Sequence, residues 1–319
     1  MENKSINLMR WLMAIAVIII HSELFKPLNF QLYTLINNGL CRLAVPFFFI
    51  TSGYFFYRKL ANNRKTSNYF RRLIRTLLIF SALEIILYGP FYYNGSNLLF
   101  LIWRTVSVGL GGIYWYLISL IITLLLLKPL WKRKIIMPGL IIGLLFYLCA
   151  TTNDAYYGLF VNHPIQSLAI THTSLFTWPQ AGLASSLLYL SLGALIYQLR
   201  PRFNHQKLLL TIVLALFLVE VCCLSYFKIA IDYNCYLLLI LAAPLLFIYL
   251  LDDPWHFISD QQSHYFKDTS LYIYMLHPFF LNIIPLFIPV LAFGPLKFLT
   301  GLIGCLLICH LIKTKQKVW

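Results

Sequence analysis

Long apolar segments recur along the whole chain and are separated by short polar gaps. Each is about 17 to 25 residues long, the length that a helix needs to cross the hydrocarbon core of a bilayer. Because lipid cannot satisfy backbone amides, such segments must be helical. We therefore predict an all-α, polytopic membrane protein with about ten transmembrane helices, at 6–24, 40–57, 73–90, 112–130, 135–151, 181–199, 207–227, 234–251, 269–288 and 291–312.

Lysine and arginine are distributed unevenly between the gaps. With the N-terminus inside, nineteen of the 25 cations fall in the cytoplasmic gaps and tails, five fall on the outer side, and Arg10 lies within the first segment. Positively charged loops stay in the cytoplasm, so both termini are predicted to be cytoplasmic. The acidic gap 252–268 is still assigned inside, because Asp contributes little to this rule.

The composition excludes a soluble protein. Of 319 residues, 60% are hydrophobic and 11% are charged, whereas soluble domains carry roughly a quarter charged residues. We predict one membrane domain over 1–319, with a retained first helix. The net charge of +15 lies in the gaps, so we expect no nucleic-acid partner. The seven cysteines include no Cys-x-x-Cys pair, and we predict neither disulfides nor a metal site.

Arg10 and His21 are the most informative polar residues within the first segment. A charge near a helix centre costs about 2.5 to 3.5 kcal/mol, so it requires a partner or a function. Eleven steps of about 100° place the two residues within roughly 20° of each other, about 16 Å apart along one helix face. An imidazole is suited to removing a proton near neutral pH. The alternative is a buried histidine that bonds a neighbouring helix.

The second and third segments carry further candidate residues. Ser52 and Gly53 are small enough for close approach of another helix or of a ligand. Arg71, Arg72 and Arg75 form a cationic cluster at a helix N-terminus, which favours phosphate groups. The alternative for the arginines is an anchor to lipid headgroups.

Several other polar residues have two interpretations each. Glu84 is predicted at a membrane depth where its carboxylate meets Arg42 or His21 at the site. The alternative, for Glu84 and also for Glu220, is a purely structural pairing with a neighbouring helix. Trp115 starts the fourth segment, where interfacial aromatic residues occur in any case. His277 precedes a proline, which frees backbone carbonyls that a histidine can bond.

Two outer loops, 91–111 and 152–180, are long enough for a functional role. The second contains Asp154, His163 and His172 and no Lys or Arg. Such side chains can hydrogen-bond and stack on sugars, and an ordinary solvated loop is the alternative.

Taken together, these elements resemble the membrane-bound acyltransferase 3 family, which modifies surface glycans and other envelope molecules. The similarity extends over nearly the whole chain. It rests on Arg10-x10-His21, Val45-Pro-Phe-Phe-Phe-Ile-Thr-Ser52-Gly53-Tyr54, Arg71-Arg72-x-x-Arg75, Tyr114-Trp115-Tyr116-Leu and Ser270-Leu-Tyr-Ile-Tyr-Met-Leu-His277-Pro278.

The resemblance implies transfer of an acyl group from cytoplasmic acyl-CoA to a hydroxyl of an envelope glycan or lipid-linked saccharide. Acetyl is the first candidate for the acyl group. It implies a bacterial inner membrane, with membrane lipids as partners, and leaves the oligomeric state open. His21 would be the catalytic base and Arg10 would serve the donor. We assign donor binding to Ser52, Gly53, Arg71, Arg72 and Arg75, and acceptor binding to Arg42, Glu84 and Trp115. Family members often read Leu-Arg-Gly where this chain has Met9-Arg10-Trp11, so Trp11 alters the packing beside Arg10.

Two alternatives come from other functional classes. The first is an exporter or flippase that moves a glycan or lipid-linked intermediate along the polar residues within the membrane. The second is an uptake or sensing module related to the membrane part of vancomycin-resistance serine racemases, which resembles the same family.

Overall fold

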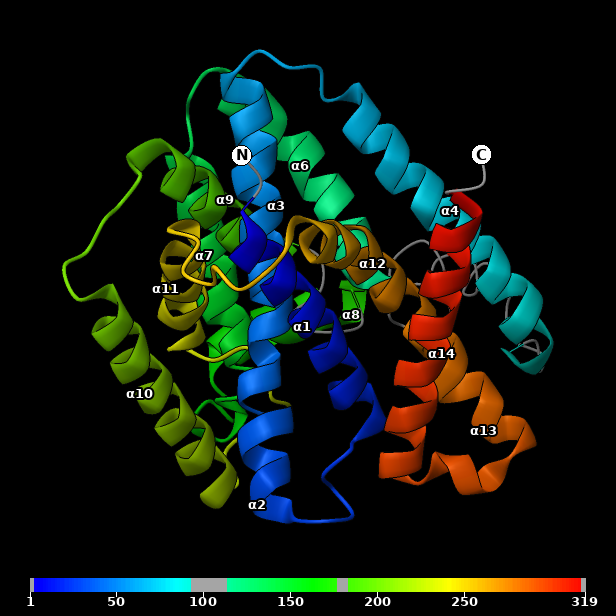
Figure 1. The fold of residues 1–319 in the computed structure, drawn as a ribbon. Coiled ribbons are helices and arrows are strands. Elements are labelled where there is room, and N and C mark those ends of the chain that lie inside the picture. Colours follow the sequence, from blue (N-terminus) through cyan, green and yellow to red (C-terminus); the bar gives the residue numbers. More distant parts are fainter. Residues whose placement is uncertain (1–2, 93–113, 177–182, 317–319) are drawn as a thin grey trace. The chain divides into compact units, whose positions relative to one another are not determined.

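The computed structural model describes residues 3–92, 114–176 and 183–316, and every regular element in these ranges is helical (Figure 1). The main α-helices are α1 (Lys4–Ser22), α3 (Ala44–Ala61), α4 (Ser67–Tyr92), α6 (Trp115–Lys132), α7 (Met137–Thr151), α8 (Pro164–Phe176), α9 (Leu183–Leu199), α10 (Gln206–Tyr226), α11 (Leu239–Leu251), α12 (Asp260–Pro278) and α14 (Gly294–Gln316). The shorter segments are α2 (Phe30–Leu32), η1 (Tyr33–Asn37), η2 (Leu40–Leu43), η3 (Tyr157–Leu159), η4 (Phe279–Ile283), α13 (Ile284–Phe287) and η5 (Pro289–Ala292).

Six helical segments of the described chain are long and apolar enough to cross a membrane. They are Lys4–Ser22, Phe30–Ala61, Trp115–Lys132, Gln206–Tyr226, Asp260–Phe287 and Gly294–Ile312, and three shorter apolar helices are Met137–Thr151, Leu183–Leu199 and Leu239–Leu251. These helices confirm the predicted all-α, multi-pass class. The count of ten spans and the cytoplasmic placement of both termini stay predictions.

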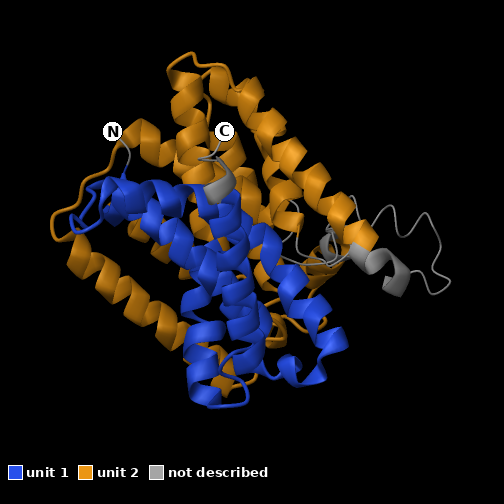
Figure 2. Cartoon of the chain, turned by 45° about the vertical axis from the view of Figure 1, so that its right-hand side comes forward, with its two compact units in different colours: residues 1–44, 249–319 blue, residues 45–248 orange. Residues whose placement is uncertain are grey.

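The chain divides into two compact units (Figure 2). Unit 1 combines residues 1–44 with residues 249–319, and unit 2 contains residues 45–248. Unit 1 is therefore built from the two ends of the chain, and each unit is described separately below.

In unit 1, α1 packs against α12 and α14 (Figure 1). Polar side-chain contacts fix its first turn. The Asn3 side chain caps α1 by accepting from the Ile6 N–H at 2.7 Å, and its amide donates to the Leu250 carbonyl at 2.7 Å. Asn7 donates to the Ser263 hydroxyl of α12 at 2.9 Å. Sequence positions more than 240 residues apart are thereby held together at one end of the α1–α12 pair.

In unit 2, glycines allow helix backbones to touch. A Cβ atom on Gly53 of α3 would lie 2.1 Å from the Leu190 carbonyl oxygen of α9, and one on Gly193 of α9 would lie 2.2 Å from the Ile50 carbonyl oxygen. Small residues at membrane helix interfaces permit this kind of approach. The structure therefore shows the close helix approach predicted for Gly53, and donor binding by Gly53 stays a prediction.

The largest differences from the sequence prediction concern two elements. α12 begins at Asp260, nine residues before the predicted span, because Ser259 and Gln262 form a capping box that starts a polar helix ahead of the apolar stretch. The predicted outer loop 152–180 contains a helix, α8 (Pro164–Phe176). The other predicted loop, 91–111, lies outside the described residues apart from its first two positions.

Candidate active site

His21 lies in the last turn of α1, and its side chain is exposed. The helix ends directly after it because Glu23 adopts a left-handed conformation (φ 53°) and donates its N–H to the Ile20 carbonyl. This turn leaves the imidazole accessible at the helix end. Arg10 lies on the same helix and is half-buried.

A second histidine contacts His21. His277 of α12 is fully buried, and its ring stacks on that of His21, with 5.2 Å between the ring centroids and 30° between the ring planes. Both residues belong to unit 1. The sequence marked each histidine separately but gave no signal that they meet, since they come from opposite ends of the chain.

The proline after His277 fixes the orientation of its ring. Pro278 has no N–H, so the carbonyl of Tyr274, four residues earlier, loses its normal helical donor. His277 Nδ1 lies 2.6 Å from that carbonyl oxygen. The sequence-based expectation that a histidine bonds a carbonyl released by this proline is confirmed.

This contact sets the proton position on His277. A carbonyl oxygen only accepts, so Nδ1 must donate and carries the proton of the neutral ring. Nε2 is then an unprotonated acceptor, and it is buried without a hydrogen-bond partner among the described residues. An unsatisfied buried acceptor of this kind costs about 1–3 kcal/mol and requires an explanation.

Two cations face His21 within unit 1. These are Arg42 of η2 and Lys297 of α14, and the Glu23 carboxylate lies near Lys297. Arg42 is held in place because its Nε donates to the Asn37 carbonyl at 3.1 Å. The start of α14 lies against the end of α1, where a Cβ on Gly294 would approach the Glu23 carbonyl oxygen to 2.8 Å.

An open groove runs along one face of α4 in unit 2, and all of its lining residues belong to this helix. Its volume is about 850 Å³, and its lining includes Arg71 and Arg75 together with Ile74, Leu78 and Ile79. Arg72 is also exposed but does not line the groove, because it lies about 100° around the helix from Arg71. This face of α4 thus presents two guanidinium groups, which can hydrogen-bond a phosphate, beside exposed apolar side chains.

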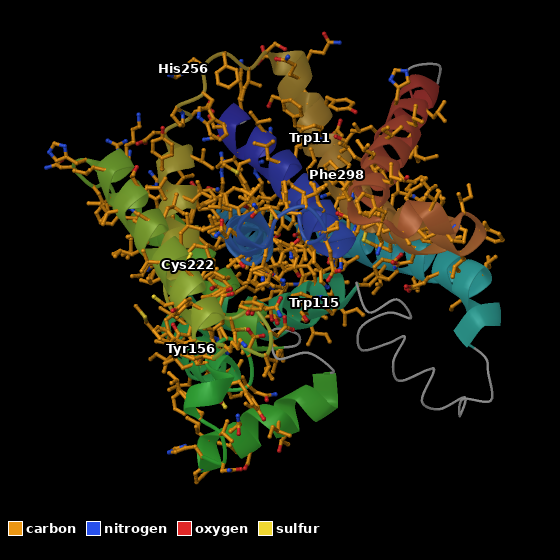
Figure 3. The ribbon with its side chains drawn as sticks, turned by 90° about the horizontal axis from the view of Figure 1, so that it is seen from below. Trp11, Trp115, Tyr156, Cys222, His256 and Phe298 are labelled. Carbon is orange, nitrogen blue, oxygen red and sulfur yellow. The ribbon has the colours of Figure 1, made fainter. Side chains whose placement is uncertain are left out.

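The remaining predicted site residues lie elsewhere in unit 2. Ser52 Oγ lies 3.4 Å from Tyr116 Oη, and Gly53 packs against α9. Trp115, labelled in Figure 3, starts α6. Its ring is tilted relative to the Phe49 ring, with 6.4 Å between the ring centroids.

Glu84 is 1% exposed, so its buried carboxylate requires partners within the protein. The predicted pairing of Glu84 with Arg42 or His21, which belong to unit 1, stays a prediction.

Two carboxylates hold the connection between α10 and α11. Asp154 is fully buried and accepts from the backbone N–H groups of Asn234 at 2.8 Å and Cys235 at 2.9 Å. Burial, and next the Asp232 carboxylate, raise the pKa of Asp154 to about 6.

Glu220 has a matching structural role. It accepts from the hydroxyl of Tyr156, labelled in Figure 3, and from the N–H groups of Leu237 at 2.8 Å and Leu238 at 3.0 Å. Glu220 therefore has the structural partners expected for it.

Comparison with known proteins gives one match along almost the whole chain. A family model described as an acyltransferase domain, of the acyltransferase 3 type, matches residues 3–314. No solved structure matches the chain.

Curated relatives match as well. An amino-acid racemase of Enterococcus faecalis is 27% identical over 96% of this chain and 45% of its own length. A serine/alanine racemase of Enterococcus gallinarum is 26% identical over 88% of this chain and 41% of its own length. The chain thus spans less than half the length of these relatives.

Proposed function

Since a match over residues 3–314 shows that the chain belongs to the acyltransferase 3 family of membrane proteins, we propose that it is an O-acyltransferase of a bacterial cytoplasmic membrane. The donor is acyl-CoA, with acetyl as the first candidate, and the acceptor is a hydroxyl of an envelope glycan or lipid-linked saccharide. The observation that supports this site best is the exposed His21 stacked on the buried His277.

The arginine groove on α4 supports the donor. Coenzyme A carries several phosphates, and guanidinium groups bind phosphate oxygens through paired hydrogen bonds. Arg71 and Arg75 line the groove on one helix face, since residues four apart are neighbours. The apolar side chains beyond them can contact the pantetheine and acyl portion of the donor.

His21 is the proposed general base for direct transfer. Its unprotonated ring nitrogen takes the proton of the acceptor hydroxyl, whose oxygen attacks the thioester carbonyl carbon. The C–S bond then breaks, the acyl group stays on the acceptor oxygen, and the CoA thiolate receives the proton from the His21 imidazolium. These steps return the proton to the leaving thiolate and require no covalent acyl-enzyme.

A His21→Ala variant tests the proposal. The protein is reconstituted in nanodiscs with radiolabelled acetyl-CoA and a cell-envelope extract as acceptor, and acetyl transfer is counted. A loss of at least about 100-fold is expected, because general-base catalysis contributes 10²–10⁴-fold. The matched control is His256→Ala, in which the replaced imidazole is exposed ahead of α12 and has no assigned role (Figure 3). Undiminished transfer by folded His21→Ala protein would refute the role of His21.

A second candidate function comes from the names of the relatives. They are an amino-acid racemase and a serine/alanine racemase, so this chain, which matches less than half of each, is alternatively a module that binds or moves an amino acid. Proteoliposomes loaded with the protein should then accumulate radiolabelled L-serine or L-alanine. Uptake without acetyl transfer would favour this candidate over the enzyme.

A further inference from the structure

We propose that His277 is a positioning residue for His21. Its Nε2 accepts a hydrogen bond from one ring nitrogen of His21, which fixes the proton on that nitrogen and leaves the other His21 nitrogen unprotonated for the acceptor hydroxyl. The inference rests on the proposed function of His21 as the base, and goes beyond it by assigning the group that selects the tautomer of the base.

The first step is the tautomer of His277 itself. Its Nδ1 lies 2.6 Å from the Tyr274 carbonyl oxygen, and this oxygen is available because Pro278 cannot donate to it. The proton is therefore on Nδ1, and Nε2 has a free lone pair. A doubly protonated ring would be a fully buried cation, which the low-dielectric surroundings disfavour strongly.

The second step concerns the donor that Nε2 lacks. Nε2 is buried and has no hydrogen-bond partner in the part of the chain that the structure describes, and native proteins leave few such groups without a reason. The imidazole stacked on His277 is that of His21, whose ring centroid is 5.2 Å away. A rotation of the His21 ring brings one of its N–H groups to Nε2.

The third step is the difference in burial and anchoring between the two rings. His277 is 0% exposed and is anchored through Nδ1, whereas His21 is exposed at the end of α1. The fixed ring therefore orients the free ring, and not the reverse. This is the role that a hydrogen-bonded partner has for metal-bound and catalytic histidines in general.

The backbone around His277 also departs from a regular helix. Directly after Pro278, residues Phe279–Ile283 form a π-helical segment, and π-bulges in α-helices occur frequently at functional sites. The charged groups that face His21 from the other packed elements are Arg42 of η2 and Lys297 of α14, with Glu23 beside Lys297. None of these can accept a hydrogen bond from His21 except Glu23, so a Glu23→Gln variant belongs in the experiment.

Two substitutions at position 277 separate its two nitrogens. In His277→Asn, the side-chain amide takes the place of Nδ1 and can still donate to the Tyr274 carbonyl, but no atom remains at the place of Nε2. In His277→Gln, the amide oxygen takes the place of Nε2 and preserves the acceptor. The pair thus tests the acceptor while both side chains remain polar and similar in size.

Steady-state acetyl transfer over a range of pH is the measurement. For His277→Asn, kcat should fall by about 10- to 100-fold, because the misoriented base slows the chemical step. The KM for acetyl-CoA should change less than about twofold, because donor binding does not involve His277. The acid limb of the kcat/KM profile should move to lower pH, because His21 loses the acceptor that favours its protonated form. His277→Gln should recover part of kcat and shift the limb back. Glu23→Gln should leave kcat at the optimum pH within about twofold of the wild-type value, because the Glu23 carboxylate is already paired with Lys26 at 2.8 Å.

A purely structural role predicts a different result. Activity would then fall by the same factor at every pH, in proportion to a lowered melting temperature, and His277→Gln would be no better than His277→Asn. That outcome, or wild-type kcat in His277→Asn, overturns the inference. If His21→Ala is inactive while His277→Asn is fully active, the inference fails alone, whereas full activity of both variants removes the proposed function as well.

A measurement that keeps His277 itself unchanged covers the case in which position 277 tolerates no substitution. Protein labelled with ¹⁵N-histidine reports the protonation of each ring nitrogen by NMR, and a Pro278→Ala variant shifts and so identifies the His277 signals. The expected spectrum has Nδ1 protonated and Nε2 unprotonated at neutral pH. A protonated Nε2 would overturn the proposal.

Discussion

A single methyl group on Gly53 is expected to separate two helices of unit 2. In the structure, a Cβ at this position would lie 2.1 Å from the Leu190 carbonyl oxygen, and distances below 3.0 Å are essentially never seen. Because both groups belong to helix backbones, neither can turn away. α3 and α9 must move apart by about 0.9 Å, the difference between these two distances, at this crossing point.

The cost follows from two opposing effects. Overpacking of this size destabilises a protein by about 1–3 kcal/mol, and Gly→Ala within a helix contributes about 0.5–1 kcal/mol in the opposite direction. Gly53→Ala should therefore lower the free energy of unfolding by about 0.5–2 kcal/mol. Gly193→Ala should have a similar effect, because its Cβ would lie 2.2 Å from the Ile50 carbonyl oxygen.

The two substitutions should not be additive. Gly53 and Gly193 lie one turn apart on the same antiparallel crossing, so the movement that makes room for one methyl also makes room for the other. The double variant should cost less than the sum of the single variants, with a coupling of about 1 kcal/mol.

Unfolding is measured by intrinsic fluorescence in detergent micelles, with Gly139→Ala as the matched control. There the added methyl meets the ends of the Leu127 and Ser191 side chains, which can shift. Additive effects, or a Gly139→Ala variant that is as unstable as Gly53→Ala, would refute this reasoning.

Other predictions concern charged groups. Burial raises the pKa of Asp154 to about 6, so the free energy of unfolding should fall as pH rises from about 4 through 6, by up to about 3 kcal/mol, and Asp154→Asn should flatten this dependence in melts at pH 4 and 7. Glu220→Ala should destabilise by about 1–3 kcal/mol in the same assay, because it leaves two backbone N–H groups unbonded, while Glu220→Gln should cost less. Lys4→Ala should leave the melting temperature unchanged within the error of the measurement, since its partner Asp260 is 86% exposed. Arg75→Ala should raise the KM for acetyl-CoA about 10-fold, and the control Arg72→Ala, outside the groove, should not; equal effects would exclude the groove as the donor site.

The lengths of the apolar segments were enough to predict the fold class, because the bilayer requires every spanning segment to be an apolar helix of about this length. They could not locate the start of α12, whose first turns are polar and are initiated by the local capping box of Ser259 and Gln262. They also gave no signal for α8 within the predicted loop, since that helix is too short to be recognised as a span.

At the candidate site, sequence spacing identified His21 and the local effect of Pro278 on His277, because both depend on residues within a few turns. The stacking of the two rings depends on how α1 packs against α12, and no pattern within either helix encodes this pairing. Gly53 shows the same limit: its small size predicted a close approach, but whether a ligand or a helix approaches is decided by α9.

The division of unit 1 between the two ends of the chain has a consequence for biogenesis. α1 leaves the ribosome about 240 residues before α12 begins, which corresponds to roughly 12 to 50 seconds at 5–20 residues per second. During that interval Asn7, Arg10 and His21 are in the insertion machinery or the lipid without the helix that later packs against them. The histidine pair is thus completed only after α12 has been synthesised, so a nascent chain halted before α12 presents a first helix without its α12 partner to membrane quality control.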